Sequence, residues 1–238
     1  MNRDRFAAVT FLILALTFAF AMPWPMRGQD NKNPYPAMAP LDQYLMDRDT
    51  EIALARSAAP ESISRDAKIL VLGRRSYETA VEGKNGFVCM VERAWTGPFD
   101  DPQFWNPKSR AAICFNPPAV RSAVPVTIKR TELALDGKSR EQIQELEKAA
   151  YAKNELPKTL EPGAMAYMMS KNAYLTDDDG HNLAHLMFYT PLMDKAKWGA
   201  DAPNSPVILL QSGPPEPFTV FLVPTGKWSD GTPAPLPK

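Results

Sequence analysis

Residues 164–223 carry the pattern that decides the fold. They contain four apolar runs of strand length, AMAYMMS (164–170), LAHLMFY (183–189), PVILLQ (206–211) and FTVFLV (218–223). Clusters of Gly, Pro, Asn and Asp separate these runs, as is typical of β-strands joined by turns. Because no helical pattern stands between most of the runs, we expect them to form an antiparallel sheet.

Upstream of these runs, the sequence predicts two helices. One covers residues 41–59 and ends at Pro60, and the other covers residues 139–153, where Ser139 and Gln142 have the spacing of a capping box. Residues 68–95 read as a hairpin and residues 124–131 as a short extended segment. The Lys129-Arg130 pair within that segment is expected to be solvated at a strand end.

These elements predict one α+β domain over residues 41–226. Its antiparallel sheet has about five to seven strands and packs against about two helices. The chain has 24 Pro among 238 residues, roughly twice the average share of about 5%. We therefore expect long Pro-rich loops between short elements.

The charge composition excludes one class of partner. The chain has 27 Lys and Arg against 27 Asp and Glu, so its formal net charge is zero. Proteins that bind nucleic acid need a basic surface to neutralise phosphates. We expect no nucleic-acid partner.

The N-terminus predicts export. Residues 6–22 (FAAVTFLILALTFAFAM) form an apolar run that follows two arginines, and Ala19 and Ala21 have the A-x-A spacing of a cleavage site. We expect residues 1–21 to be a signal peptide and the mature protein to be periplasmic or extracellular. The alternative is an uncleaved anchor, which would be the chain's only membrane contact. Residues 22–40 should be an extended Pro-rich lead-in, and residues 227–238 a flexible tail.

Export makes the two cysteines informative. Cys89 and Cys114 both lie in apolar, strand-like runs, and an oxidising compartment favours a disulfide between them. Two separately buried thiols are the alternative. Neither residue lies in a C-x-x-C motif or beside a histidine, so a reactive thiol is not expected.

Both histidines lie in the segment DDDGHNLAH (177–185). His181 and His185, with Asp177 or Asp179, could bind zinc or, with nearby methionines, copper. However, Gly180 and Asn182 predict a turn, which would separate the two imidazoles. We therefore expect no metal, and a packed sheet face that contains one satisfied histidine is the simplest interpretation.

The remaining candidate is a pocket for an organic molecule. Alternation places His185 and Tyr189 on one sheet face, and we expect Tyr167 on the neighbouring strand to join them. The loop WTGPFDDPQFWNP (95–107) would add Trp95 and Trp105.

No catalytic motif of a known hydrolase or nucleotide-binding enzyme occurs. A carboxylate pair such as Glu92 and Glu161 has no spacing that identifies it. We therefore expect a non-enzymatic small-ligand-binding protein. The alternatives are a metal-dependent or histidine-based enzyme centred on His185, and an interaction module that binds another protein through exposed aromatic surface.

Overall fold

A computed structural model of the protein describes residues 33–178 and 183–236. The expected signal peptide, residues 1–21, and the first part of the Pro-rich lead-in lie outside the described residues. The chain from Asn33 onward forms one compact unit.

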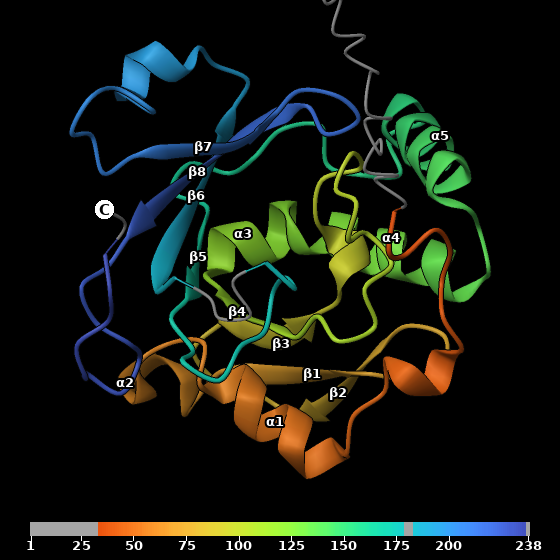
Figure 1. The fold of residues 1–238 in the computed structure, drawn as a ribbon, viewed down its shortest axis with the longest axis horizontal. Helices are drawn as coiled ribbons and strands as arrows, with labels where there is room; N and C mark the ends of the chain where they lie inside the picture. Colours follow the sequence, from red (N-terminus) through yellow and green to blue (C-terminus); the bar gives the residue numbers. More distant parts are fainter. Residues whose placement is uncertain (1–32, 179–182, 237–238) are drawn as a thin grey trace, which may run out of the picture. The chain divides into compact units, whose positions relative to one another are not determined.

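The described chain contains a mixed sheet of eight strands in the order β2–β1–β3–β4–β5–β6–β8–β7 (Figure 1). The strands are β1 (Lys68–Leu72), β2 (Tyr77–Val81), β3 (Val88–Glu92), β4 (Ala111–Phe115), β5 (Met165–Met168), β6 (His185–Pro191), β7 (Ile208–Ser212) and β8 (Phe218–Pro224). Strands β1 and β3 pair parallel, and the other neighbouring pairs are antiparallel. The predicted α+β class is confirmed, and the four apolar runs of residues 164–223 correspond to β5, β6, β7 and β8.

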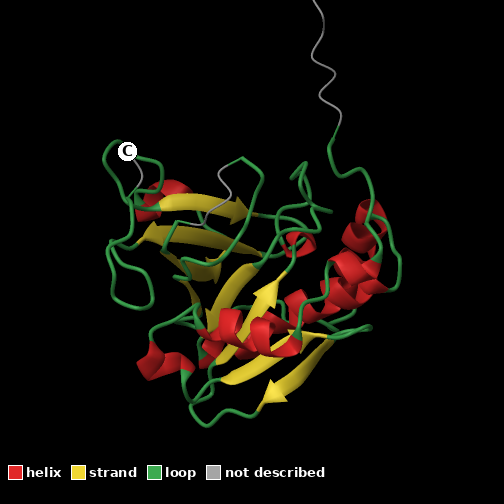
Figure 2. Ribbon diagram, turned by 60° about the horizontal axis from the view of Figure 1, so that its bottom comes forward, coloured by secondary structure: helices red, strands yellow, loops and turns green. Residues whose placement is uncertain are grey.

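Five α-helices accompany the sheet in the described residues (Figure 2). They are α1 (Arg48–Arg56), α2 (Glu61–Ser64), α3 (Pro117–Ser122), α4 (Val124–Leu135) and α5 (Arg140–Ala152). The capping box of α5 is confirmed, since Ser139 Oγ accepts from the Gln142 amide and Gln142 Oε1 accepts from the Ser139 amide. The long helix expected over residues 41–59 is shorter, because Asp47 caps α1 by accepting from the Thr50 amide at 2.9 Å.

Helix α4 corrects the extended segment expected at residues 124–131. Valine and threonine in this stretch favour a strand, and Pro125 suggests an irregular start. However, Pro125 lies in the first turn of α4, where a helix tolerates proline. Val126, Arg130 and Ala134 are buried at a spacing of four residues, so packing of one helix face outweighs local β propensity.

Strand alternation divides the sheet into two faces with different partners. Cys89, Val91 and Cys114 pack with Ala55 of α1 on one face. Val88, Met90 and Phe115 belong to the core cluster on the other face, which also includes residues of α3 and α4. In Figure 1, α1 accordingly lies on one side of β1–β4, and α3 and α4 lie on the other.

The disulfide between Cys89 and Cys114 is confirmed. The two residues oppose each other directly on the antiparallel strands β3 and β4, and both are completely buried. The bond therefore joins two central strands rather than the base of an exposed loop. Within the described residues, no helix is long and apolar enough to cross a membrane.

Both ends of the described chain contact the body of the protein. Tyr35 and Met38 of the lead-in pack against the main core cluster. In the segment expected to be a flexible tail, Trp228 is buried and the Ser229 amide donates to the Met169 carbonyl at 2.9 Å.

Candidate functional site

A cavity of about 380 Å³ borders the face of the sheet that packs against α4. The sheet supplies most of its apolar wall: Phe115, Met168, Met187, Phe218, Val220 and Leu222. Helix α4 contributes Val126, Thr127 and Arg130, and the segment after β3 contributes Thr96 to Pro98. The cavity is therefore built by residues that lie far apart in the sequence.

Strand register explains why these side chains meet. Met168 opposes His185, Met187 opposes Leu222 and Tyr189 opposes Val220. Directly opposed residues project from the same face of a sheet. One face of β5, β6 and β8 thus presents a continuous surface to the cavity.

A bulge in β7 adds two consecutive residues to the cavity wall. The pairing of β7 with β8 shifts between Leu209 and Gln211, so Leu210 is the extra residue. A bulge redirects side chains that strict alternation would place on opposite faces. Leu210 and Gln211 both line the cavity as a result, and Leu210 remains 42% exposed.

Glu92, the last residue of β3, provides a carboxyl group in the cavity wall. Thr127 Oγ1 donates to Glu92 Oε1 at 3.0 Å. Burial raises the pKa of Glu92 to about 7, and hydrogen bonds from Thr127 and Thr96 and the charge of Arg130 offset this increase only in part. The carboxyl is therefore partly protonated near neutral pH.

Arg130 is the charged group that α4 contributes. Its Nε and Nη2 atoms donate to the two carboxylate oxygens of Glu147 at 2.8 and 2.9 Å, and Nη2 also donates to Glu216. Its Nη1 atom donates to the carbonyls of Thr96 and Gly97 at 3.2 and 3.0 Å. A guanidinium has five N–H donors, so all the donors of Arg130 are used within the protein.

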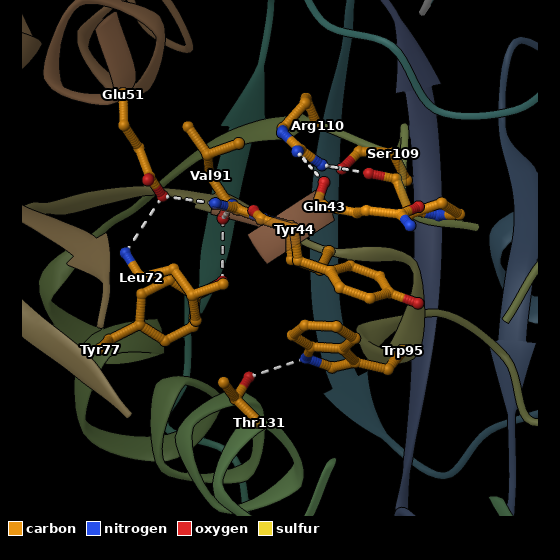
Figure 3. A network of polar contacts seen from close by, with 12 residues as sticks. Gln43, Tyr44, Glu51, Leu72, Tyr77, Val91, Trp95, Ser109, Arg110 and Thr131 are labelled. Carbon is orange, nitrogen blue, oxygen red and sulfur yellow. Dashed lines mark hydrogen bonds and ion pairs between the residues drawn. The ribbon is translucent and has the colours of Figure 1, made fainter. Parts of the chain in front are cut away.

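The second arginine of the cavity wall, Arg93, directs its side chain elsewhere. Its Nη2 atom donates to Glu51 Oε1 at 2.9 Å, and neither side chain has more than 1% of its surface exposed. Arg93 Nε donates to the Tyr44 carbonyl at 2.8 Å. Figure 3 shows this network around Glu51, which also accepts from the Leu72 amide at 3.1 Å.

His185 is buried, and its Nδ1 atom bonds to the Leu183 carbonyl. Burial lowers the pKa of His185 to about 4. The imidazole is therefore neutral at physiological pH. Because a carbonyl only accepts, Nδ1 carries the proton and Nε2 keeps its lone pair.

Tyr189 is 9% exposed and also lines the cavity. Its ring lies 6.1 Å from the Phe115 ring and 6.3 Å from the Phe218 ring, measured between centroids. Burial, together with the charge of Glu92, raises the pKa of Tyr189. Within the described residues, neither the Tyr189 hydroxyl nor His185 Nε2 has a hydrogen-bond partner.

The structure brings together two of the five residues that the sequence indicates as ligand-binding. His185 and Tyr189 line the cavity, whereas Tyr167 opposes Leu186 and thus lies on the other sheet face. Trp95 and Trp105 belong to the buried core and do not line the cavity. Trp95 Nε1 donates to Thr131 Oγ1 at 3.1 Å, so its polar atom also faces the protein interior.

The structure describes two of the four candidate metal ligands, Asp177 and His185. His181 and Asp179 lie outside the described residues. Asp177 accepts from Lys108 Nζ at 2.9 Å and from the hydroxyls of Tyr35 and Tyr174, and these donors hold its pKa below the ordinary range. In the part of the chain that the structure describes, no three His, Cys, Asp or Glu side chains are arranged to hold a metal ion.

Sequence reasoning missed most of the polar wall of the cavity. Glu161 forms a surface ion pair with Arg121 at 2.6 Å and does not line the cavity with Glu92. Arg130 is 2% exposed rather than solvated. Arg130 is buried because the helical spacing of α4 places it on the packed face of the helix. The β-branched residues of this stretch favour a strand, so the sequence alone did not indicate that face.

Comparisons with protein-family models, with curated proteins and with solved structures found no match to this chain.

Proposed function

We propose that this is an exported protein that binds a small, mainly apolar molecule in the cavity and leaves it chemically unchanged. The observation that carries the proposal is a mainly apolar cavity wall that includes Tyr189 and His185, whose hydroxyl and Nε2 atoms form no hydrogen bond with the described residues.

The dimensions of the cavity support a small organic ligand. Pockets for such ligands have volumes of about 300–1,000 Å³ and are mostly apolar, with a few polar groups that orient the ligand. At about 380 Å³ this cavity lies at the small end of that range. Three aromatic rings, those of Phe115, Tyr189 and Phe218, offer flat surfaces to an apolar body.

The polar atoms give the ligand its orientation. The Tyr189 hydroxyl and His185 Nε2 keep hydrogen-bonding capacity that no described residue uses. A ligand that bonds to either atom gains a net stabilisation of about 0.5–1.5 kcal/mol. An apolar molecule with one polar end therefore fits the cavity better than a pure hydrocarbon.

Export is supported by the disulfide between Cys89 and Cys114, because disulfides persist mainly in oxidising compartments. Mass spectrometry of the protein recovered from the cell exterior or periplasm tests this part of the proposal. We expect a mature chain that begins near residue 22. Recovery of the intact chain from the cytoplasm would contradict export.

Binding is tested with N-phenyl-1-naphthylamine, an apolar dye whose fluorescence rises in an apolar environment. We expect saturable fluorescence with the natural chain and its loss in Met187→Trp, which fills the cavity. Leu192→Trp is the matched control, because Leu192 is 54% exposed and does not line the cavity. Absence of saturable binding to the folded natural chain would refute the proposal.

A histidine-based enzyme is the second candidate. One observation favours it: the cavity contains a neutral imidazole, His185, and a carboxyl group, Glu92, whose pKa of about 7 suits proton transfer. Mass spectrometry of a bound ligand after incubation distinguishes the candidates. A product that no longer forms in His185→Gln would favour the enzyme, and an unchanged ligand would favour binding.

The protein-interaction module has less support from the aromatic loop. Trp95, Phe104 and Trp105 are at most 5% exposed, so their rings form part of the core rather than an exposed apolar surface.

A further inference from the structure

We propose that the ligand of this cavity is an amphipathic amine whose protonated nitrogen binds the Glu92 carboxylate. This inference rests on the proposed binding function and adds the chemical class of the ligand.

The charges around the cavity favour a cationic ligand over an anionic one. Arg130 faces two carboxylates, those of Glu147 and Glu216, and all five of its donors are used. Arg93 is paired with Glu51 and has no exposed side-chain surface. Neither arginine can therefore bind an anionic ligand.

Glu92 and Asp101 line the cavity, and neither carboxylate has an ion-pair partner among the described residues; of the two, Glu92 lies at the end of β3, beside the apolar sheet wall. Thr127 and Thr96 are its hydrogen-bonding neighbours, whereas an ionised carboxylate has about four acceptor sites. Glu92 lines the cavity and is only partly buried, so some of its surface is open to a ligand. A positive charge in the cavity would provide the counterion that the protein does not.

The hydrogen-bonding groups that a ligand meets in the cavity are mainly acceptors. Glu92 and the Nε2 atom of His185 are acceptors, and the Tyr189 hydroxyl can accept as well as donate. A primary ammonium group brings three donors and no acceptor. A carboxylate ligand would bring only acceptors and would be repelled by Glu92.

The apolar wall defines the rest of the ligand. The rings of Phe115, Tyr189 and Phe218 lie next to one another along the cavity, with centroid separations of 6.1 and 6.3 Å. Such rings favour an apolar or aromatic body, and their faces also attract cations. The ligand should therefore have an apolar body with the amine at one end.

Three probes of nearly equal size test the inference: 3-phenylpropylamine, 3-phenyl-1-propanol and 3-phenylpropionate. Isothermal titration calorimetry at pH 8 compares them, with Glu92 ionised and the amine protonated. Hydrogen bonds between charged groups are worth more than neutral ones, so we expect the amine to bind at least about tenfold more tightly than the alcohol. The propionate should bind most weakly.

The substitution Glu92→Gln should remove the preference for the amine over the alcohol. We expect this variant to bind the amine at least about tenfold more weakly than the natural chain and the alcohol equally well. The exposed Glu145→Gln is the matched control and should change neither affinity. Glu92→Asp keeps the charge and should retain a preference for the amine.

The pH dependence gives a second readout on the natural chain. The amine should bind more tightly as pH rises from 6 to 8, because the ligand requires the ionised form of Glu92. Other titratable groups of the cavity wall are Arg130 from α4, Tyr189 and His185 from β6, Glu216 before β8 and Asp101 of the loop after β3, with Glu147 of α5 behind Arg130. Glu147 also has a pKa of about 7, raised by burial, so only pH dependence that disappears in Glu92→Gln supports the inference.

The outcomes separate this inference from the proposed function. If N-phenyl-1-naphthylamine and the alcohol bind but the amine binds no more tightly than the alcohol, the amine inference is overturned and the binding function stands. If the naphthylamine dye and all three probes fail to bind, the proposed function itself fails. Preference for the amine that persists in a folded Glu92→Gln would overturn the role of Glu92.

Discussion

Glu92 and Arg93 are consecutive residues, yet they serve opposite faces of the sheet. Glu92 lines the cavity and accepts from Thr127 of α4, whereas Arg93 forms a buried ion pair with Glu51 of α1. The alternation of β3 extends through these two residues, because Val91 and Arg93 share the face that α1 covers. The end of β3 thus contributes one side chain to the α1 layer and one carboxyl group to the cavity wall.

Glu92 should make stability depend on pH. In the unfolded chain its carboxyl ionises near the ordinary pKa of 4.5, whereas the folded-state pKa is about 7. The unfolded state therefore loses this proton first, and the contribution of Glu92 to stability falls as pH rises from about 4.5 to 7 and stays constant above that. Over this pH window, we expect the free energy of unfolding of the natural chain to fall by up to about 3 kcal/mol relative to that of Glu92→Gln. Urea unfolding at several pH values measures this difference, and parallel curves for the two proteins would refute it.

His185 should produce a pH effect of the opposite sign. Its folded-state pKa of about 4 lies below the ordinary value of 6.5, so the unfolded chain binds a proton first as pH falls. Stability should therefore decrease between about pH 6.5 and 4, by up to about 3 kcal/mol relative to His185→Gln. Nitrogen chemical shifts of the imidazole give an independent check. A ring that becomes protonated near pH 6.5 in the folded protein would contradict the prediction.

The buried pair of Arg93 and Glu51 should be sensitive to the loss of either partner. Glu51→Ala leaves the Arg93 guanidinium without its counterion and the Leu72 amide without its acceptor. Breaking a buried ion pair costs about 3–5 kcal/mol, and chemical unfolding should show a loss of this size.

The exposed pair of Arg74 and Asp42 is the matched control, because its side chains are 72% and 77% exposed. Asp42→Asn should change the free energy of unfolding by less than about 1 kcal/mol. Similar losses in Glu51→Ala and Asp42→Asn would show that burial does not control the energy of these pairs.

The disulfide should stabilise the protein because it lowers the conformational entropy of the unfolded chain. Cys89 and Cys114 are separated by 25 residues, and closing a loop of that length is worth about 3.5 kcal/mol in the chain-entropy model. The double variant Cys89→Ser, Cys114→Ser should therefore unfold at a clearly lower urea concentration. Unfolding of the natural chain with and without a reducing agent gives the corresponding comparison, and identical midpoints would contradict the prediction.

Several features of the fold could be predicted because their signals are local. The four apolar runs of residues 164–223 and the capping box at Ser139 depend on neighbouring residues alone. The disulfide between Cys89 and Cys114 could be predicted from the presence of only two cysteines and from the expected oxidising compartment. Helix α4 could not be predicted in this way, because burial of Arg130 against Glu147 and Glu216 involves segments distant in the sequence.

For this protein, the sequence by itself determined the α+β class, the strands after residue 164 and the cysteine pair. Only the tertiary structure decided which side chains share the cavity. The register of β5 with β6 places Tyr167 opposite Leu186 and Met168 opposite His185, so Tyr167 is excluded and Met168 takes its place. Side chains alternate with a period of two, and a register difference of one residue therefore exchanges the faces. Local periodicity defines two faces of a strand, but long-range pairing and helix packing decide which face borders the cavity.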